Sequence, residues 1–95
     1  MTAARSTTPT LRVYVAPGCA GCRTALEVVE AVRRARPAQR VEVVDLADQP
    51  ARPLPDGVVG TPAYVIGEHL VSLGNPDLAE LLGHLDSAAK LLEDE

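Results

Sequence analysis

Four short segments of the chain have the hydrophobic pattern of β-strands. Each segment is either continuously apolar or alternates apolar with polar side chains, which is typical of strands that bury at least one face. The segments are residues 11–16, 41–46, 63–66 and 69–73. Only Gly67 and Glu68 separate the last two segments. A two-residue turn with glycine first predicts a β-hairpin there.

Between the first two strand segments, the period of the apolar residues changes to that of an α-helix. From about residue 19 to residue 35, most charged side chains lie opposite an apolar stripe. The stripe consists of Cys22, Leu26, Val29 and Val32, widened by Ala25 and Val28. Pro37 ends the helix, because the residue before a proline is pushed out of the helical region.

A second helix is predicted after the fourth strand segment. Asn75 is a good N-cap, and Pro76 suits the first helical position. Asp77 and Glu80 would lie near the positive end of the helix, where acidic side chains are favourable. The buried stripe is predicted to contain Leu78, Leu81, Leu82 and Leu85, continued by Ala89 and Leu92. The overall order is therefore β-α-β followed by β-β-α.

This order predicts an α/β fold with a mixed four-stranded sheet. A strand, a helix of about seventeen residues and a second strand form a crossover unit, so the first two strands should be parallel. Residues 47–59 contain three prolines and can hold at most one helical turn. One domain is expected over residues 11–89, with a flexible leader at 1–10 and an acidic C-terminal tail at 90–95.

Charge and hydropathy restrict the partners and the compartment. The 95 residues carry a net charge of −4, to which the last three residues contribute strongly. A near-neutral body with an acidic tail favours neither nucleic acid nor an anionic membrane as a partner. The arginines near residues 33–40 are interpreted as pairing with a helix C-terminus and with solvent. No apolar run approaches the ~20 residues of a membrane span, and the first ten residues lack a secretory hydrophobic core. We therefore expect a cytoplasmic protein.

The only two cysteines of the chain, Cys19 and Cys22, lie at the turn from the first strand to the first helix. A thiol at a helix N-terminus faces unpaired N–H groups and the positive end of the helix dipole, both of which favour the thiolate. Cysteine pKa values at such positions fall from about 8.5 to roughly 3.5–7.5. Cys19, on the turn side, would be exposed and would attack a disulfide. Cys22, one turn into the helix, would be shielded and would resolve the mixed disulfide.

Metal binding is an alternative use of the same cysteine spacing. A structural zinc site needs four ligands, and the chain contains no second pair of cysteines and no suitably spaced pair of histidines. Ligation of a metal or an iron–sulfur cluster by the cysteines, for example between two chains, remains a further alternative. A third is that the two cysteines are inert. We expect no metal site and no cofactor within a single chain.

The sequence resembles small members of the thioredoxin-fold superfamily, of the thioredoxin- or glutaredoxin-like kind. The resemblance covers residues 11 to about 86 and rests on four features. These are Cys19-Ala20-Gly21-Cys22, Thr61-Pro62 before a strand, the Gly67 hairpin and Gly74 before the last helix. The resemblance implies that Pro62 is cis and lies against the cysteine pair, and that the backbone of Thr61 meets an extended substrate. It also implies that the middle helix of the family is shortened or missing at 47–59.

The segment 74–77 resembles, more loosely, the segment with which glutaredoxins hold glutathione. The resemblance implies that Gly74 and Asp77 bind substrate, with Asp77 contacting the amino end of the peptide. Capping of the last helix by Asn75 and Asp77 is the favoured interpretation of the same residues. Gly18 before the cysteine pair, and the two residues within it, match neither the thioredoxin nor the glutaredoxin signature. The resemblance therefore supports the fold and the dithiol chemistry and leaves the subfamily open.

These observations favour a thiol–disulfide oxidoreductase in which Cys19 and Cys22 are catalytic. Its expected partners are a disulfide-containing protein or a low-molecular-weight thiol as substrate, and a reductase that recycles the pair. The alternative is a non-enzymatic thioredoxin-fold binding module. The first strand, together with Asp45-Leu46, Gln49-Pro50 and Gly60-Thr61-Pro62, also resembles KaiB-like clock proteins, which bind partners but lack the cysteine pair. In a binding module, the cysteines would be inert or act as a regulatory switch, and the exposed surface around Pro62 and the 47–59 loop would dock a partner.

Overall fold

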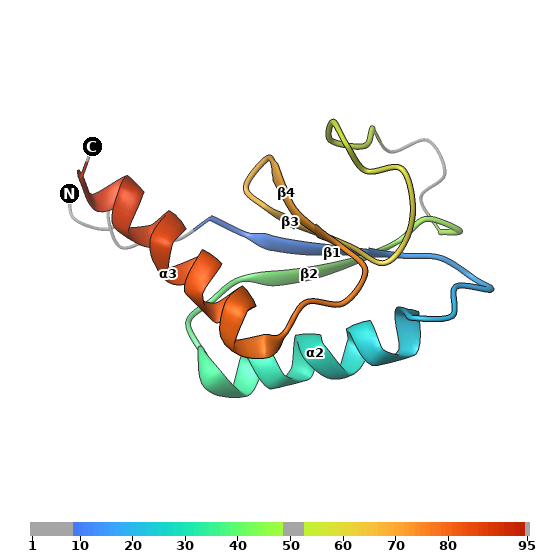
Figure 1. Cartoon of the computed structure of the whole chain (residues 1–95), viewed down its shortest axis with the longest axis horizontal. Coiled ribbons are helices and arrows are strands. Elements are labelled where there is room, and N and C mark those ends of the chain that lie inside the picture. The colour runs from blue at the N-terminus through green and yellow to red at the C-terminus, as the bar shows by residue number, and fades with distance from the viewer. Residues whose placement is uncertain (1–8, 49–52, 95) are drawn as a thin grey trace.

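A computed structural model describes residues 9–48 and 53–94 of the chain. Its elements are β1 (Leu11–Val15), α2 (Cys22–Ala35), β2 (Val41–Asp45), β3 (Ala63–Ile66), β4 (His69–Leu73) and α3 (Leu78–Asp94) (Figure 1). The predicted order of strands and helices is confirmed. The first eight residues of the expected leader, residues 49–52 of the proline-rich segment and the last residue of the expected tail lie outside the described part.

The four strands form one mixed sheet in the order β2-β1-β3-β4. β1 pairs with β2 in parallel, as the crossover unit predicts, and with β3 in antiparallel orientation. β3 and β4 form the predicted hairpin, with a register irregularity at Tyr64 and Val65. Gly67, the first residue of its turn, has a φ of +63°, a conformation that favours glycine.

Both helices cover the same face of the sheet. The core on this face contains residues from β1, β3, α2 and α3: Leu11, Val13, Val15, Cys22, Ala25, Val29, Val32, Tyr64, Ile66, Leu81 and Leu85. The first three alternate along β1, so the period-two pattern places them together. Because Cys22 belongs to this core, the start of α2 is held against the sheet. No helix of the described part is both long and apolar enough to span a membrane.

The opposite face of the sheet has a smaller core built from Tyr14, Val44, Val58, Ala63 and Val65. Val58 comes from the segment between β2 and β3, which has no helix or strand at residues 53–62. Proline cannot be accommodated in a regular helix interior, and Pro53 and Pro55 lie in this segment. In the described part, an irregular segment therefore covers this face of the sheet. This agrees with the expectation that the middle helix is shortened or missing.

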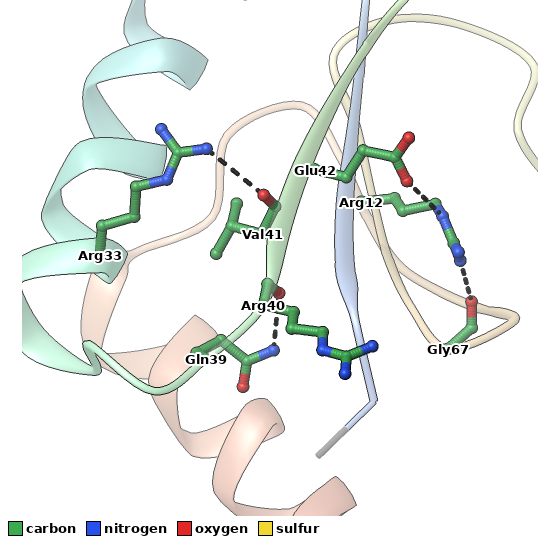
Figure 2. Close-up of polar contacts among 7 residues, drawn as sticks. All are labelled: Arg12, Arg33, Gln39, Arg40, Val41, Glu42 and Gly67. Atoms are coloured by element: carbon green, nitrogen blue, oxygen red, sulfur yellow. Dashed lines mark hydrogen bonds and ion pairs between the residues drawn. The ribbon is translucent and has the colours of Figure 1, made fainter. Parts of the chain in front are cut away.

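Arginine side chains connect elements of the fold that are far apart in the sequence (Figure 2). Arg12 on β1 donates a hydrogen bond to the Glu42 carboxylate at 2.9 Å and one to the Gly67 carbonyl at 3.3 Å. Arg33, in the last turn of α2, donates to the Val41 carbonyl at the start of β2 at 3.3 Å. Arg36 pairs with Asp86 of α3 at 3.0 Å. These arginines therefore connect strands, turns and helices.

The folded body extends slightly beyond the boundaries expected from the sequence. The carbonyls of Pro9 and Thr10 accept hydrogen bonds from the Gln39 side chain at 2.7 Å and from the Gly67 N–H at 3.0 Å. These two residues, assigned by the sequence to a flexible leader, are thus bound to the body. At the other end, α3 continues through most of the expected tail to Asp94.

Candidate active site

The two cysteines lie where β1 passes into α2. Cys22 is the first residue of the helix, whereas Cys19 belongs to the turn before it. A disulfide bond joins them, their Cα atoms lie 5.4 Å apart, and the Cys22 N–H donates a hydrogen bond to the Cys19 carbonyl at 3.3 Å. Cys22 is buried, with 9% of its surface exposed, while Cys19 is only partly buried. The pair is therefore asymmetric in its access to solvent.

The start of α2 leaves its positive end uncompensated. The N-cap residue is Gly21, which offers no side chain to the first N–H groups, and the first turn contains no acidic residue. The exposed Arg23 follows Cys22 directly. Unpaired N–H groups and the helix dipole both stabilise a thiolate relative to a thiol. In the reduced protein, this environment favours ionisation of a cysteine at the start of the helix.

Pro62 lies against the turn that carries the cysteines. The Thr61–Pro62 peptide bond is cis, as the resemblance implied. Pro62 is buried, and a Cβ atom placed on Gly21 would approach its Cδ atom to 3.3 Å. Gly74, with a φ of +86°, donates its N–H to the Pro62 carbonyl at 2.8 Å. The fold therefore brings three predicted site segments together: the cysteine turn, the proline and the loop after β4.

An apolar hollow of about 300 Å³ adjoins the residue before the cis proline. It is lined by Ala16, Leu46, Leu54, Val58, Val59, Gly60 and Thr61. Val59 is 85% exposed, so its side chain is almost entirely in contact with solvent. Exposed apolar surface of this kind is available to a binding partner.

Asn75 connects this site to the core, and its predicted role as N-cap is wrong. α3 begins at Leu78, and the Asp77 carbonyl accepts the N–H of Leu81 at 3.0 Å. The Asn75 amide instead donates to the Gly21 carbonyl at 3.0 Å and accepts a hydrogen bond from the Tyr64 hydroxyl at 2.7 Å. The prediction failed because residues 75–77 match the local pattern of a helix cap. Such a pattern cannot reveal a hydrogen bond from Asn75 to a residue 54 positions away.

Tyr64 is the functional-site neighbour that the sequence analysis missed. Its side chain is fully buried in the core shared with Cys22, yet its hydroxyl reaches Asn75. A buried tyrosine usually finds a partner for its hydroxyl. The sequence did contain a signal for this role. A tyrosine lies two positions after Pro62, and a polar loop follows the hairpin that contains it. Asp77, which the resemblance assigned to substrate, is exposed, and the contacts that tie this loop to the cysteine turn are made by Asn75.

The burial of Tyr64 predicts a loss of stability at alkaline pH. Burial raises the pKa of its hydroxyl to about 12 from the ordinary tyrosine value of 10.0. Above pH 10 the unfolded chain therefore binds fewer protons at this group than the folded protein, so stability falls as pH rises towards 12. We expect Tyr64 to cost about 1 kcal/mol of unfolding free energy between pH 9 and pH 11.

Chemical denaturation of the wild type and of Tyr64→Phe at these two pH values measures this contribution. Both proteins share every other titrating group, so the difference between their unfolding free energies isolates Tyr64. We expect the wild type to lose more stability than the variant as pH rises. A difference that does not change with pH would contradict this assignment.

The described residues 9–48 and 53–94 contain no group of three or more His, Cys, Asp or Glu side chains that could hold a metal ion. The local chemistry that the arrangement does offer is that of two thiols. They form one bond with each other, one is accessible, and the other is shielded by the core. Such a pair can exchange electrons with a disulfide without a cofactor.

Comparison with known proteins finds similarity to one family model and to solved structures. A family model described as "Thioredoxin domain" matches residues 10–86. Among solved structures, the fold is similar to that of oxidised thioredoxin O2 from Arabidopsis thaliana, with a TM-score of 0.54 and 16% identity over 85% of this chain and 75% of that chain. At this identity the structural match concerns the fold alone. No curated protein matches the chain.

Proposed function

The chain belongs to the thioredoxin domain family, and from this premise we propose that it is a thiol–disulfide oxidoreductase with Cys19 and Cys22 as its redox centre. The observation that carries the proposal is the position of the pair. A disulfide joins the partly buried Cys19, in the turn before α2, to the buried Cys22, the first residue of the helix, and Pro62 lies against the turn between them.

The proposed reaction proceeds in two exchanges. The Cys19 thiolate attacks one sulfur of a substrate disulfide, forms a mixed disulfide and releases the other substrate sulfur as a thiolate. Cys22 then loses its proton and attacks the Cys19 sulfur, which releases the second substrate thiolate and closes the Cys19–Cys22 disulfide. The substrate gains two electrons and the dithiol loses two. The uncompensated start of α2 supports the first step, because it lowers the pKa of a nearby thiol.

Substrate would bind beside Thr61 and Pro62. The Thr61 backbone precedes the cis bond, and the apolar hollow next to it would receive a side chain of a protein substrate. A low-molecular-weight thiol would instead be held at the loop after β4. Gly74 in this loop is bonded to the Pro62 carbonyl, and Asp77 is exposed at the start of α3. A reductase or a small thiol would return the oxidised pair to the dithiol.

A turnover assay tests this function. The protein is mixed with a disulfide-linked fluorescent peptide and an excess of dithiothreitol, and the release of fluorescence is followed. We expect the wild type to accelerate release and the double variant Cys19→Ser, Cys22→Ser to leave the uncatalysed rate unchanged. Acceleration by the double variant would contradict the proposal.

The exposed apolar residues favour a second candidate, a binding module that recognises a partner without redox turnover. Leu54 and Val59 are 43% and 85% exposed, and both line the hollow beside Thr61. Exposed apolar surface of this kind marks binding sites in many proteins. The two candidates differ in one respect. Partner binding that survives replacement of both cysteines, in a protein without turnover, would favour the binding module.

A further inference from the structure

A chain of two hydrogen bonds leads from the core to the cysteine turn. Tyr64 on β3 contacts Asn75 in the loop after β4, and Asn75 contacts Gly21 between the cysteines. We propose that Asn75 is a positioning residue, held by Tyr64, that keeps the cysteine turn closed in the reduced protein and so favours formation of the Cys19–Cys22 disulfide. The inference deepens the proposed function and rests on it for its biological meaning.

The chemistry of the three groups fixes the direction of both hydrogen bonds. A backbone carbonyl can only accept, so the Asn75 Nδ2 group must face Gly21. The Asn75 Oδ1 atom then faces the Tyr64 hydroxyl, which must donate its proton. Burial of Tyr64 raises the pKa of the hydroxyl, so this donor stays protonated at physiological pH. The amide of Asn75 therefore has one orientation that satisfies both partners.

The bridge acts on the peptide unit between Gly21 and Cys22. The Gly21 carbonyl accepts two hydrogen bonds at 3.0 Å, one from Asn75 and one from the Ala25 N–H in the first turn of α2. The N–H of the same peptide unit belongs to Cys22 and closes the turn on the Cys19 carbonyl. A hydrogen bond to a carbonyl strengthens the donor at the other end of the same peptide unit. Asn75 thus supports the contact that holds the two cysteine residues close.

The space around Gly21 shows how closely the bridge fits. A Cβ atom on Gly21 would lie 3.2 Å from the Asn75 Nδ2 atom and 3.3 Å from Pro62. Asn75 and Pro62 therefore enclose the turn from the side of the sheet and the loop. Without a side chain at residue 21, the amide of Asn75 can approach the backbone directly.

The bridge matters more for the dithiol than for the disulfide. In the oxidised protein, the covalent bond holds the turn closed whether or not Asn75 is present. In the reduced protein, only noncovalent contacts hold it, so loss of the bridge lets the two thiols separate. The effective concentration of one thiol at the other then falls, and formation of the disulfide becomes less favourable.

Equilibration with glutathione measures this effect. In the reaction, the dithiol and one oxidised glutathione give the protein disulfide and two reduced glutathiones, with two electrons transferred. A net hydrogen bond of ordinary strength predicts that Asn75→Ala lowers the equilibrium constant about three- to tenfold. A tenfold decrease corresponds to a rise of ~30 mV in the reduction potential. The fractions of dithiol and disulfide are read by alkylation and mass spectrometry.

Two further variants separate positioning from a general effect on the loop. Tyr64→Phe keeps the volume of the buried ring and removes only the hydroxyl that orients Asn75, so we expect a smaller change in the same direction. Ser72→Ala is the matched control. It removes a 2.9 Å hydrogen bond from Ser72 to the Gly74 carbonyl in the same loop, and Ser72 makes this contact without touching Gly21. We expect its equilibrium constant to equal that of the wild type.

The positioning role of Asn75 and the proposed function are tested by different outcomes. An unchanged constant in Asn75→Ala, or an equal decrease in Ser72→Ala, would overturn the positioning role. The equilibrium needs no protein substrate and no turnover. A wild type that fails the turnover assay but shows the predicted order of equilibrium constants would therefore overturn only the proposed function.

Discussion

Replacing Cys19 with serine should lower the rate of disulfide exchange by about a thousandfold or more, because the attacking sulfur is lost. Cys22→Ser should behave differently. Its Cys19 is still accessible in the turn before α2 and keeps the favourable environment of the helix start. It should therefore attack a substrate disulfide at a rate similar to that of the wild type. It should then stop at the mixed disulfide, because no second thiol displaces the product.

Intact-protein mass spectrometry after mixing with a disulfide-linked peptide distinguishes the two variants. We expect Cys22→Ser to gain the mass of one half of the peptide within the time of one wild-type turnover, and Cys19→Ser to remain unmodified. The buried position of Cys22 is the physical reason for the difference. Rapid modification of Cys19→Ser together with an inert Cys22→Ser would reverse the proposed roles. In cells, the same Cys22→Ser variant would retain the physiological substrate as a mixed disulfide.

The parts of the fold that depend on local patterns were predictable from the sequence. Alternation along residues 11–15 placed one face of β1 in the core. The helical period after it predicted α2, although the helix begins at Cys22 and not one turn before it. Gly67 predicted the hairpin turn, because its positive φ is a local requirement. Parallel pairing of β1 with β2 followed from the helix between them. Each of these inferences needed only residues near one another in the chain.

The contacts that shape the site depend on residues far apart in the sequence. A polar residue before a helix fits the N-cap pattern whether its side chain bonds to the helix or to another part of the protein. For this reason the sequence favoured capping by Asn75. The structure places a carbonyl of the cysteine turn and a buried hydroxyl within reach of the same amide. Because Tyr64 appeared only as a strand residue in the hydrophobic pattern, its polar role was missed.

The arrangement of layers explains why one side of the site is open. Both helices, including Cys22 at the start of α2, pack on one face of the sheet. The segment with Val58 covers the other face. Prolines in that segment prevent a regular helix. The irregular segment leaves the side chains of Leu54 and Val59 exposed. The sequence predicted the absence of a long helix here. It did not predict that the remaining chain would form an apolar hollow beside Thr61.

The rate at which Cys19 is alkylated as a function of pH tests the central claim most directly. Cys22→Ser contains Cys19 as its only thiol, so the rate of reaction with iodoacetamide reports the fraction of thiolate at this position. The helix start should lower the pKa of Cys19 below the value of about 8.5 for an unperturbed cysteine. At pH 6, we expect the folded variant to react faster than the same variant in denaturant, where the helix is absent. Each unit by which the pKa falls should raise the rate about three- to fourfold, because the gain in thiolate is partly offset by its lower nucleophilicity. A midpoint near pH 8.5 in both states would contradict the assignment of Cys19 as an activated, attacking thiol.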